Sequence, residues 1–201
     1  RPSRTRRLDQ SAGFTAHTEP PAAQPPATGP TAPAAEEKDV DEIPIVTERR
    51  GGFVLGVTGG IAAYKAIEVC RRLVDAGAHV TPILTEAALE MVGQTTFTAL
   101  ASERPKTSLW HDVDPIPHTK MGQNCDAIVV CPATARIISD LRTGRSADLL
   151  SATLIATEAP VVICPAMHTE MWEQASVQEN LSVLAARGVL IVPPESGRLA
   201  G

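Results

Sequence analysis

From Gly52 onward, short runs of apolar and often β-branched residues alternate with longer segments in which apolar residues recur at helical spacing. The apolar runs predict strands at 53–58, 79–84, 127–131, 161–164 and 189–192. The helical patterns predict helices at 61–76, 87–100, 134–143, 149–156 and 176–187. Strands that are apolar along their whole length and separated by helices indicate a parallel sheet covered on both faces. We therefore expect a doubly wound α/β domain.

The first fifty residues have a different composition from the rest of the chain. They hold 8 of the 17 prolines, together with eight alanines and a single aromatic residue, Phe14. Such a segment cannot bury enough apolar surface to offset the entropy lost on ordering. We expect a flexible, disordered tail over residues 1–50 and one folded domain over residues 51–201. A plain extension is the favoured interpretation of the tail, with a docking arm or oligomer clasp as the alternative.

Charge and cysteine content narrow the class of protein further. The net charge of −5 over 201 residues argues against a protein that works by neutralising phosphate backbones, so no nucleic-acid partner is expected. The apolar stretches, such as 160–167, are too short to span a membrane. The cysteines at 70, 125, 131 and 164 show neither metal-ligand spacing nor a dense disulfide framework. These features predict a soluble protein of the reducing cytoplasm with no membrane partner and no metal.

In open parallel sheets, ligands bind beyond the carboxyl ends of the strands, so the residues that follow each strand are the candidate site. A glycine pair, Gly59-Gly60, leads from the first strand into a helix, where backbone N–H groups and the helix dipole can face an anion. A tight strand-to-helix turn is the equally favoured alternative. Thr85 follows the second strand at a helix N-cap position, and capping alone would explain it.

The third and fourth strands are also followed by unusual segments. Small residues at 132–135 would let a flat ligand approach the backbone, and the segment 165–172 brings a His, a Trp and two Met to the same edge. His118 is the second histidine expected on this side. A lone histidine is more often structural than catalytic, but two beside one site favour a functional role. The sequence contains neither Gly-x-Ser-x-Gly nor His-Glu-x-x-His, so hydrolase and metalloenzyme functions lack support.

Five motifs in order resemble one family. They are Gly59–Lys65, Pro117-His118, Pro132–Ala135, Ser146–Leu150 and Pro165–Trp172. Together they resemble the homo-oligomeric flavin-containing cysteine decarboxylases, which include phosphopantothenoylcysteine decarboxylase of coenzyme A synthesis and the decarboxylases that act on the C-terminal Cys of ribosomally made peptides. The resemblance covers about three quarters of the chain.

The resemblance implies a Rossmann-like (flavodoxin-like) subunit in a trimer, with trimers often assembled into a dodecamer and FMN near the subunit interface. It implies His118 as the catalytic base, and a reaction in which the substrate cysteine is oxidised to a thioaldehyde that loses CO2 readily. The residues implied for FMN are Gly59, Gly60, Ile61, Thr85, Ala88, Pro132, Ala133, Thr134, Ala135, Ala166 and Met167. Those implied for the substrate are His168, Met171 and Trp172.

Two positions depart from the family pattern. His168 stands where the family has an Asn that grips the substrate carboxylate, although an imidazole can still donate to a carboxylate. Gly201 stands where many coenzyme A enzymes have a flap Cys that helps to return electrons to the product. The second departure, together with the long N-terminal tail and the absence of a fused ligase domain, favours oxidative decarboxylation of a peptide's C-terminal Cys to an aminoenethiol. Phosphopantothenoylcysteine decarboxylase is the alternative, and a non-catalytic flavin-binding regulatory subunit is a further one.

Overall fold

The computed structural model describes residues 52–110 and 116–195. The predicted tail, its boundary with the domain and the flap position at Gly201 lie outside these residues, so the interpretations placed on them remain predictions.

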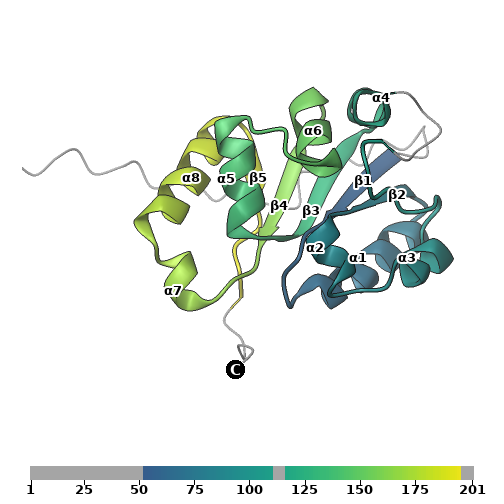
Figure 1. Cartoon of the computed structure of the whole chain (residues 1–201), viewed down its shortest axis with the longest axis horizontal. Coiled ribbons are helices and arrows are strands. Elements are labelled where there is room, and N and C mark those ends of the chain that lie inside the picture. The colour runs from purple at the N-terminus through teal and green to yellow at the C-terminus, as the bar shows by residue number, and fades with distance from the viewer. Residues whose placement is uncertain (1–51, 111–115, 196–201) are drawn as a thin grey trace, which may run out of the picture. The chain divides into compact units, whose positions relative to one another are not determined.

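The described residues form a five-stranded parallel sheet with the order β2-β1-β3-β4-β5 (Figure 1). The strands are β1 (Gly52–Val57), β2 (His79–Leu84), β3 (Ala127–Ala133), β4 (Val161–Pro165) and β5 (Leu190–Ile191). The chain moves from β1 outward to β2 and later from β3 outward in the opposite direction to β4 and β5. The order therefore reverses between β1 and β3, and the crevice at such a point is where doubly wound folds bind ligands.

Eight helices connect the strands within the described residues. They are α1 (Ala63–Asp75), α2 (Glu86–Leu89), α3 (Gln94–Leu100), α4 (Pro117–Asn124), α5 (Ala135–Thr143), α6 (Leu149–Ala156), α7 (Thr169–Trp172) and α8 (Ala175–Ala186). None of the helices in these residues has both the length and the apolar character needed to cross a membrane.

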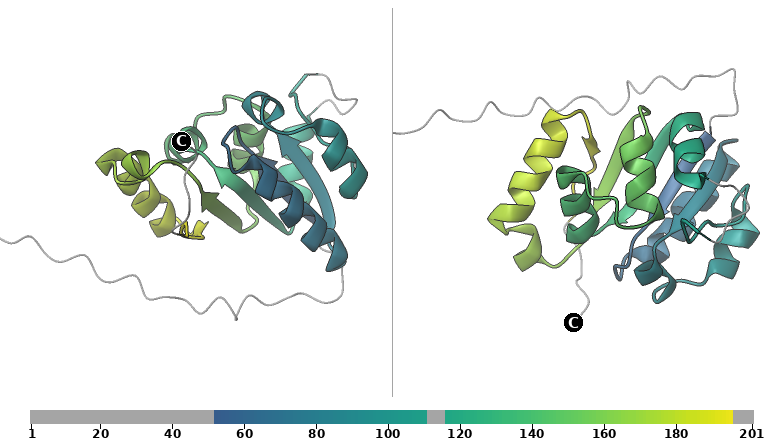
Figure 2. Two further views of the ribbon diagram at one scale, coloured as in Figure 1. Left: turned by 90° about the horizontal axis from the view of Figure 1, so that it is seen from below. Right: turned by 45° about the horizontal axis from the view of Figure 1, so that its top comes forward.

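Helices cover both faces of the sheet, as the two views of Figure 2 show. Alternation along β3 explains the two layers, because successive side chains of a strand point to opposite faces. Ile128 and Val130 are fully buried in the core shared with α5, α6 and α8. Val129 and Cys131 pack against the core on the other face, which α1 and α3 cover. Each face therefore has its own apolar core, and the doubly wound α/β prediction is confirmed.

The structure differs from the predicted elements in its shorter helices. The helix expected at 87–100 is two helices, α2 and α3, because Gly93 has extended backbone geometry (φ −78°, ψ 130°) and begins the second. Helices α4 and α7 were not predicted. A single turn such as α7 and a Pro-initiated segment such as α4 are too short to show a clear apolar period.

Candidate functional site

The carboxyl ends of β1, β3 and β4 converge on Gly60. A Cβ placed on Gly60 would lie 3.5 Å from Cγ2 of Thr134, 3.7 Å from Cγ of Pro132 and 3.9 Å from the carbonyl oxygen of Ala166. We call these four residues the cradle. The missing side chain of Gly60 leaves open the space between three segments that are far apart in the sequence, so a flat ligand can approach the backbone there.

The neighbouring Gly59 joins the same edge to α2. A Cβ on Gly59 would overlap Ala87, with the Ala87 backbone carbon and oxygen both 2.7 Å away. Thr85 caps α2, since its Oγ1 accepts a hydrogen bond from the Ala88 N–H at 3.2 Å. The capping prediction for Thr85 is confirmed, and the structure brings Gly59, Thr85 and Ala88 together as expected.

Thr58 was missed as a site residue, although it belongs to the same turn. Its hydroxyl is buried, donates to the carbonyl oxygen of Pro132 at 2.6 Å and accepts from the Thr134 N–H at 3.2 Å. These two bonds fix the end of β1 to the end of β3 beneath the cradle. The signal that could have identified Thr58 is a hydroxyl residue between the end of the apolar strand and the glycine pair.

The helix N-termini at this edge differ in how they are capped. Among the described residues, no side chain caps α1 or α5, and neither helix has an acidic residue in its first turn. By contrast, Asp148 and Ser151 form a reciprocal capping box at the start of α6. The first N–H groups of a helix have no intrahelical partner, and its dipole favours an anion there. In α1, which begins three residues after Gly60, the Ala63 and Lys65 N–H groups donate to the carbonyl oxygens of Gly60 and Ala62 at 2.8 and 2.9 Å. The uncapped start of α1 can therefore favour a phosphate group mainly through its dipole.

The other residues implied for the cofactor lie around the cradle. Ala133 is fully buried, and its carbonyl oxygen accepts the Ala166 N–H at 3.2 Å. Ala135 begins α5 and is half-buried, and Ile61 is exposed at the start of α1. The structure therefore brings these residues to one edge of the sheet.

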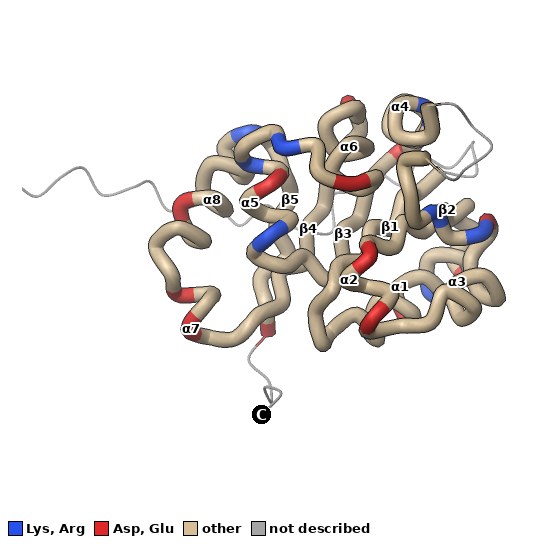
Figure 3. Tube along the Cα trace, in the orientation of Figure 1, with Lys and Arg blue, Asp and Glu red and all other residues tan. Residues whose placement is uncertain are grey.

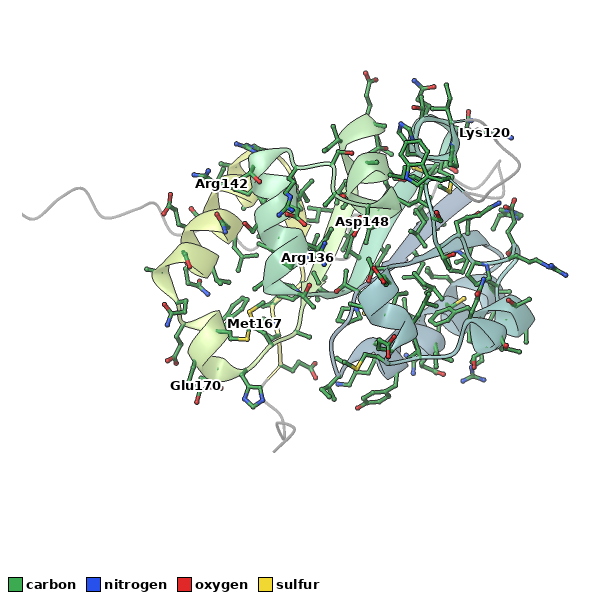
Figure 4. All side chains as sticks on the ribbon, in the orientation of Figure 1. Lys120, Arg136, Arg142, Asp148, Met167 and Glu170 are labelled. Carbon is green, nitrogen blue, oxygen red and sulfur yellow. The ribbon has the colours of Figure 1, made fainter. Side chains whose placement is uncertain are left out.

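A cavity of about 560 Å³ opens beside this edge, between α2, the start of α6 and the segment 107–110. Ligand cavities in proteins run to roughly 300–1,000 Å³, so a nucleotide-sized group can enter it. Its lining includes the carboxylates of Glu86, Glu90 and Asp148, with Arg136 from α5 as the cation among its described residues. Figure 3 shows the acidic positions over α2 and at the start of α6, and Figure 4 labels Arg136 and Asp148.

The segment after β4 presents two kinds of side chain. Met167 and Trp172 are half-buried and pack against the core that α5, α6 and α8 cover. His168 and Met171 are exposed, and His168 Nδ1 lies 3.8 Å from Glu170 Oε2. Figure 4 shows Met167 on the segment that leads into α7 and Glu170 pointing away from the domain. Of the residues implied for the substrate, His168 and Met171 are therefore the ones open to a ligand.

His118 lies away from the cradle within one chain. It belongs to α4, whose Pro117 and Met121 line a cavity with Gly52 and His79, the first residues of β1 and β2. These residues mark the amino ends of the strands, and Figure 1 shows α4 at this end of the sheet. Nδ1 of His118 is enclosed and has no hydrogen-bond partner among the described residues. One copy of the chain therefore does not bring His118 to the edge that holds the cradle.

Comparison with known proteins identifies the class. The Flavoprotein family model matches residues 46–201, and the chain belongs to this family. The structure is similar to that of the FMN-dependent cysteine decarboxylase SpaF, with 30% sequence identity, a TM-score of 0.70 and coverage of 73% of this chain and 86% of SpaF. A phosphopantothenoylcysteine (PPC) decarboxylase complexed with pantothenoylaminoethenethiol has the same fold, with 24% identity and a TM-score of 0.67. The family resemblance inferred from the sequence is confirmed.

Curated relatives are more similar in sequence. The coenzyme A biosynthesis bifunctional protein CoaBC of Mycobacterium tuberculosis is 46% identical over 148 residues, which are 74% of this chain and 35% of that protein. CoaBC of Escherichia coli is 42% identical over 153 residues, covering 74% of this chain and 37% of that protein. The chain spans about a third of the length of the curated relatives it matches.

These relatives correct the preferred function drawn from the sequence. We expected a decarboxylase of the C-terminal Cys of a ribosomally made peptide, on the strength of Gly201. The relatives at 41–46% identity are CoaBC proteins, whereas the peptidyl-cysteine decarboxylase EpiD is 19% identical and shares the fold. The peptide interpretation is therefore wrong. It failed because it depended on Gly201 and on features outside the folded domain, whereas the similarity to CoaBC extends over about 150 residues.

Proposed function

We propose that this chain is an FMN-dependent decarboxylase that acts on phosphopantothenoylcysteine in coenzyme A biosynthesis. The observation that carries the proposal is the 41–46% identity to CoaBC proteins over about 150 residues. The geometry of the cradle supports it, because Gly60 leaves open the space a flat ring would enter and α1 starts directly beside it. We propose in addition that the protein acts in the cytoplasm.

The cradle residues and the start of α1 have separate roles in this proposal. Gly60 and Thr134 would face the ring of FMN, and the uncapped start of α1 would favour its phosphate through the helix dipole. Thr58 would keep the ends of β1 and β3 at a fixed separation, so that the ring and the phosphate are held in one geometry. When bound, the flavin supplies the two-electron oxidation that makes loss of CO2 from the cysteine easy.

The exposed residues after β4 are suited to the substrate. His168 can donate a hydrogen bond to the cysteine carboxylate, and Met171 offers apolar contact beside it. The cavity next to the cradle is lined by three carboxylates, so an anionic phosphate is favoured there only next to Arg136. The substrate would therefore be oriented by charge, with its phosphate away from Glu86 and Glu90.

We propose that the site is completed by a second copy of the chain in a homo-oligomer, a trimer that can assemble further into a dodecamer. The support is the position of His118, which lies at the amino ends of the strands while the cradle lies at the carboxyl ends. His118 of one copy would then act as the base beside the cradle of the next, holding the proton that leaves the substrate thiol.

The experiment offers the FMN-loaded protein two substrates in one reaction, phosphopantothenoylcysteine and a peptide that ends in Cys. Mass spectrometry then measures which one becomes lighter, either by the mass of CO2 or by the mass of CO2 and two hydrogens. We expect loss from phosphopantothenoylcysteine and none from the peptide. Loss from the peptide, or from neither substrate while FMN remains bound, would overturn the proposal.

A further inference from the structure

Two cysteines lie directly beneath the cradle on neighbouring strands. Cys131 precedes Pro132 on β3, and Cys164 precedes Pro165 on β4. The residues one step earlier, Val130 and Ile163, are paired in the parallel register, and the register then shifts by one residue before Ala133 pairs with Pro165.

The pleat places both thiols on one face of the sheet. Val130 and Ile163 are buried in the core beneath α5, α6 and α8, so the residues after them point to the opposite face. Cys131 packs against the core on that face, beside α1, so the two thiols face each other from neighbouring strands. All four cysteines are free thiols.

The separation suits a disulfide. Neighbouring strands lie about 4.8 Å apart, and the Cα atoms of a disulfide are usually about 4.4–6.8 Å apart. The other cysteines are placed differently. Cys70 is fully buried on α1, and Cys125 lies before the start of β3, where its Sγ is 3.5 Å from the carbonyl oxygen of Gly122.

The surroundings make one thiol of the pair the more acidic. The neighbouring Cys164 thiol lowers the pKa of Cys131, and the nearby Lys65 ammonium lowers it further although burial opposes the shift. The same contact, together with burial, raises the pKa of Cys164. A thiolate next to a second thiol, both half-buried and so open to small reagents, is the arrangement of a redox-sensitive cysteine and its resolving partner.

We propose that Cys131 and Cys164 form a redox-active dithiol, which hydrogen peroxide converts reversibly to a disulfide between β3 and β4. The Cys131 thiolate attacks one peroxide oxygen, the O–O bond breaks, and a sulfenic acid and water form after proton uptake. The sulfur of Cys164 then attacks the sulfenic sulfur, the S–S bond forms, and the hydroxyl leaves as a second water. Two thiols are oxidised by two electrons and one peroxide is reduced to two waters.

Oxidation would also change the geometry of the cradle. Pro132 and Ala166 belong to it and lie one and two residues beyond the two cysteines. The S–S bond, about 2.05 Å long, is shorter than the contact of two unbonded thiols, so it would draw the two strands together beneath these residues. The oxidised protein is therefore expected to retain less FMN. This consequence rests on the proposed function, whereas formation of the disulfide does not.

The test treats the reduced full-length chain with one equivalent of hydrogen peroxide, blocks the remaining thiols and maps peptides by mass spectrometry. Trypsin, which cuts after Lys and Arg, leaves Cys125 and Cys131 on the peptide 121–136 and Cys164 on the peptide 146–187. We expect these two peptides to be linked, lighter by two hydrogens than their sum, and released by dithiothreitol.

Cysteine-to-alanine variants identify which thiols form the disulfide. Cys125→Ala should keep the link between the two peptides, and Cys131→Ala or Cys164→Ala should abolish it. The proposal is overturned if both peptides remain unlinked in the wild-type chain, or if the link disappears in Cys125→Ala. If the disulfide forms but FMN retention is unchanged, the proposed dithiol is confirmed and the proposed location of FMN in the cradle is contradicted.

Discussion

Thr58 shows how one hydroxyl can set the geometry of this site. It is buried and makes a hydrogen bond to each of Pro132 and Thr134, so it joins two strands that are 74 residues apart in the sequence. The sequence could predict a role for Gly59 and Gly60 in the site, because a glycine pair between a strand and a helix is a known anion-binding turn. It could not predict that Cys131 contacts Cys164, because that contact depends on the register between two strands.

Replacing Thr58 with Val keeps the shape of the side chain and removes the hydroxyl. We expect a loss of about 1–3 kcal/mol in the free energy of unfolding, because the buried Pro132 carbonyl and the partly buried Thr134 N–H lose their partner. Urea unfolding of the apoprotein measures it. Thr98→Val is the matched control, since the Thr98 hydroxyl is exposed and donates only to Gln94 on the same helix. Equal effects of the two substitutions would contradict this role for Thr58.

At the scale of elements, the longer helices and the buried strands were predictable and the short connections were not. The helix α1 and strand β3 show clear apolar patterns, and both lie close to the predicted ranges. The helix α4 begins at a proline and has a mixed face, so its position against α6 is set by tertiary contacts. The carbonyl oxygen of Gly122 accepts from Thr157 at 2.7 Å, and a Cβ on Gly122 would meet Ala156 at 3.0 Å.

Asp148 should contribute to the stability of the domain through the capping box of α6. Its Oδ1 accepts from the N–H of Ser151 at 2.8 Å. Asp148→Ala is therefore expected to lower the free energy of unfolding by about 0.5–2 kcal/mol. Ser146→Ala, at an exposed position two residues earlier, should change it by less than about 0.5 kcal/mol. The cap has no energetic role if chemical denaturation gives the same midpoint for both variants.

At the scale of the whole molecule, the residues of the proposed site lie at both ends of the sheet. The carboxyl ends hold the cradle, and the amino ends hold His118. A chain that acted alone would leave these two parts separate. Sequence motifs place residues in order along one chain, so they could not reveal this separation.

His118→Asn should retain bound FMN and lose decarboxylation, because the substitution removes the proposed base and leaves the cradle unchanged. Visible absorbance measures the flavin, and CO2 release measures the reaction. Co-expression of the His118→Asn chain with the Gly60→Ala chain then tests whether each site is formed by two copies. Mixed oligomers should regain activity, since some sites combine an intact cradle from one copy with His118 from another. Activity in His118→Asn alone, or none in the mixture, would contradict these roles.

The central claim is that the cradle holds FMN, and the most direct measurement is the dissociation constant of FMN for Gly60→Ala. The added methyl would enter the space bounded by Thr134, Pro132 and Ala166 without a contact shorter than 3.5 Å to the protein itself. We predict that flavin fluorescence titration gives a dissociation constant raised by at least about tenfold, or about 1.4 kcal/mol, with an unchanged thermal unfolding midpoint of the apoprotein. Gly93→Ala, on an exposed turn, should bind FMN as the wild type does. An unchanged dissociation constant for Gly60→Ala would contradict the claim.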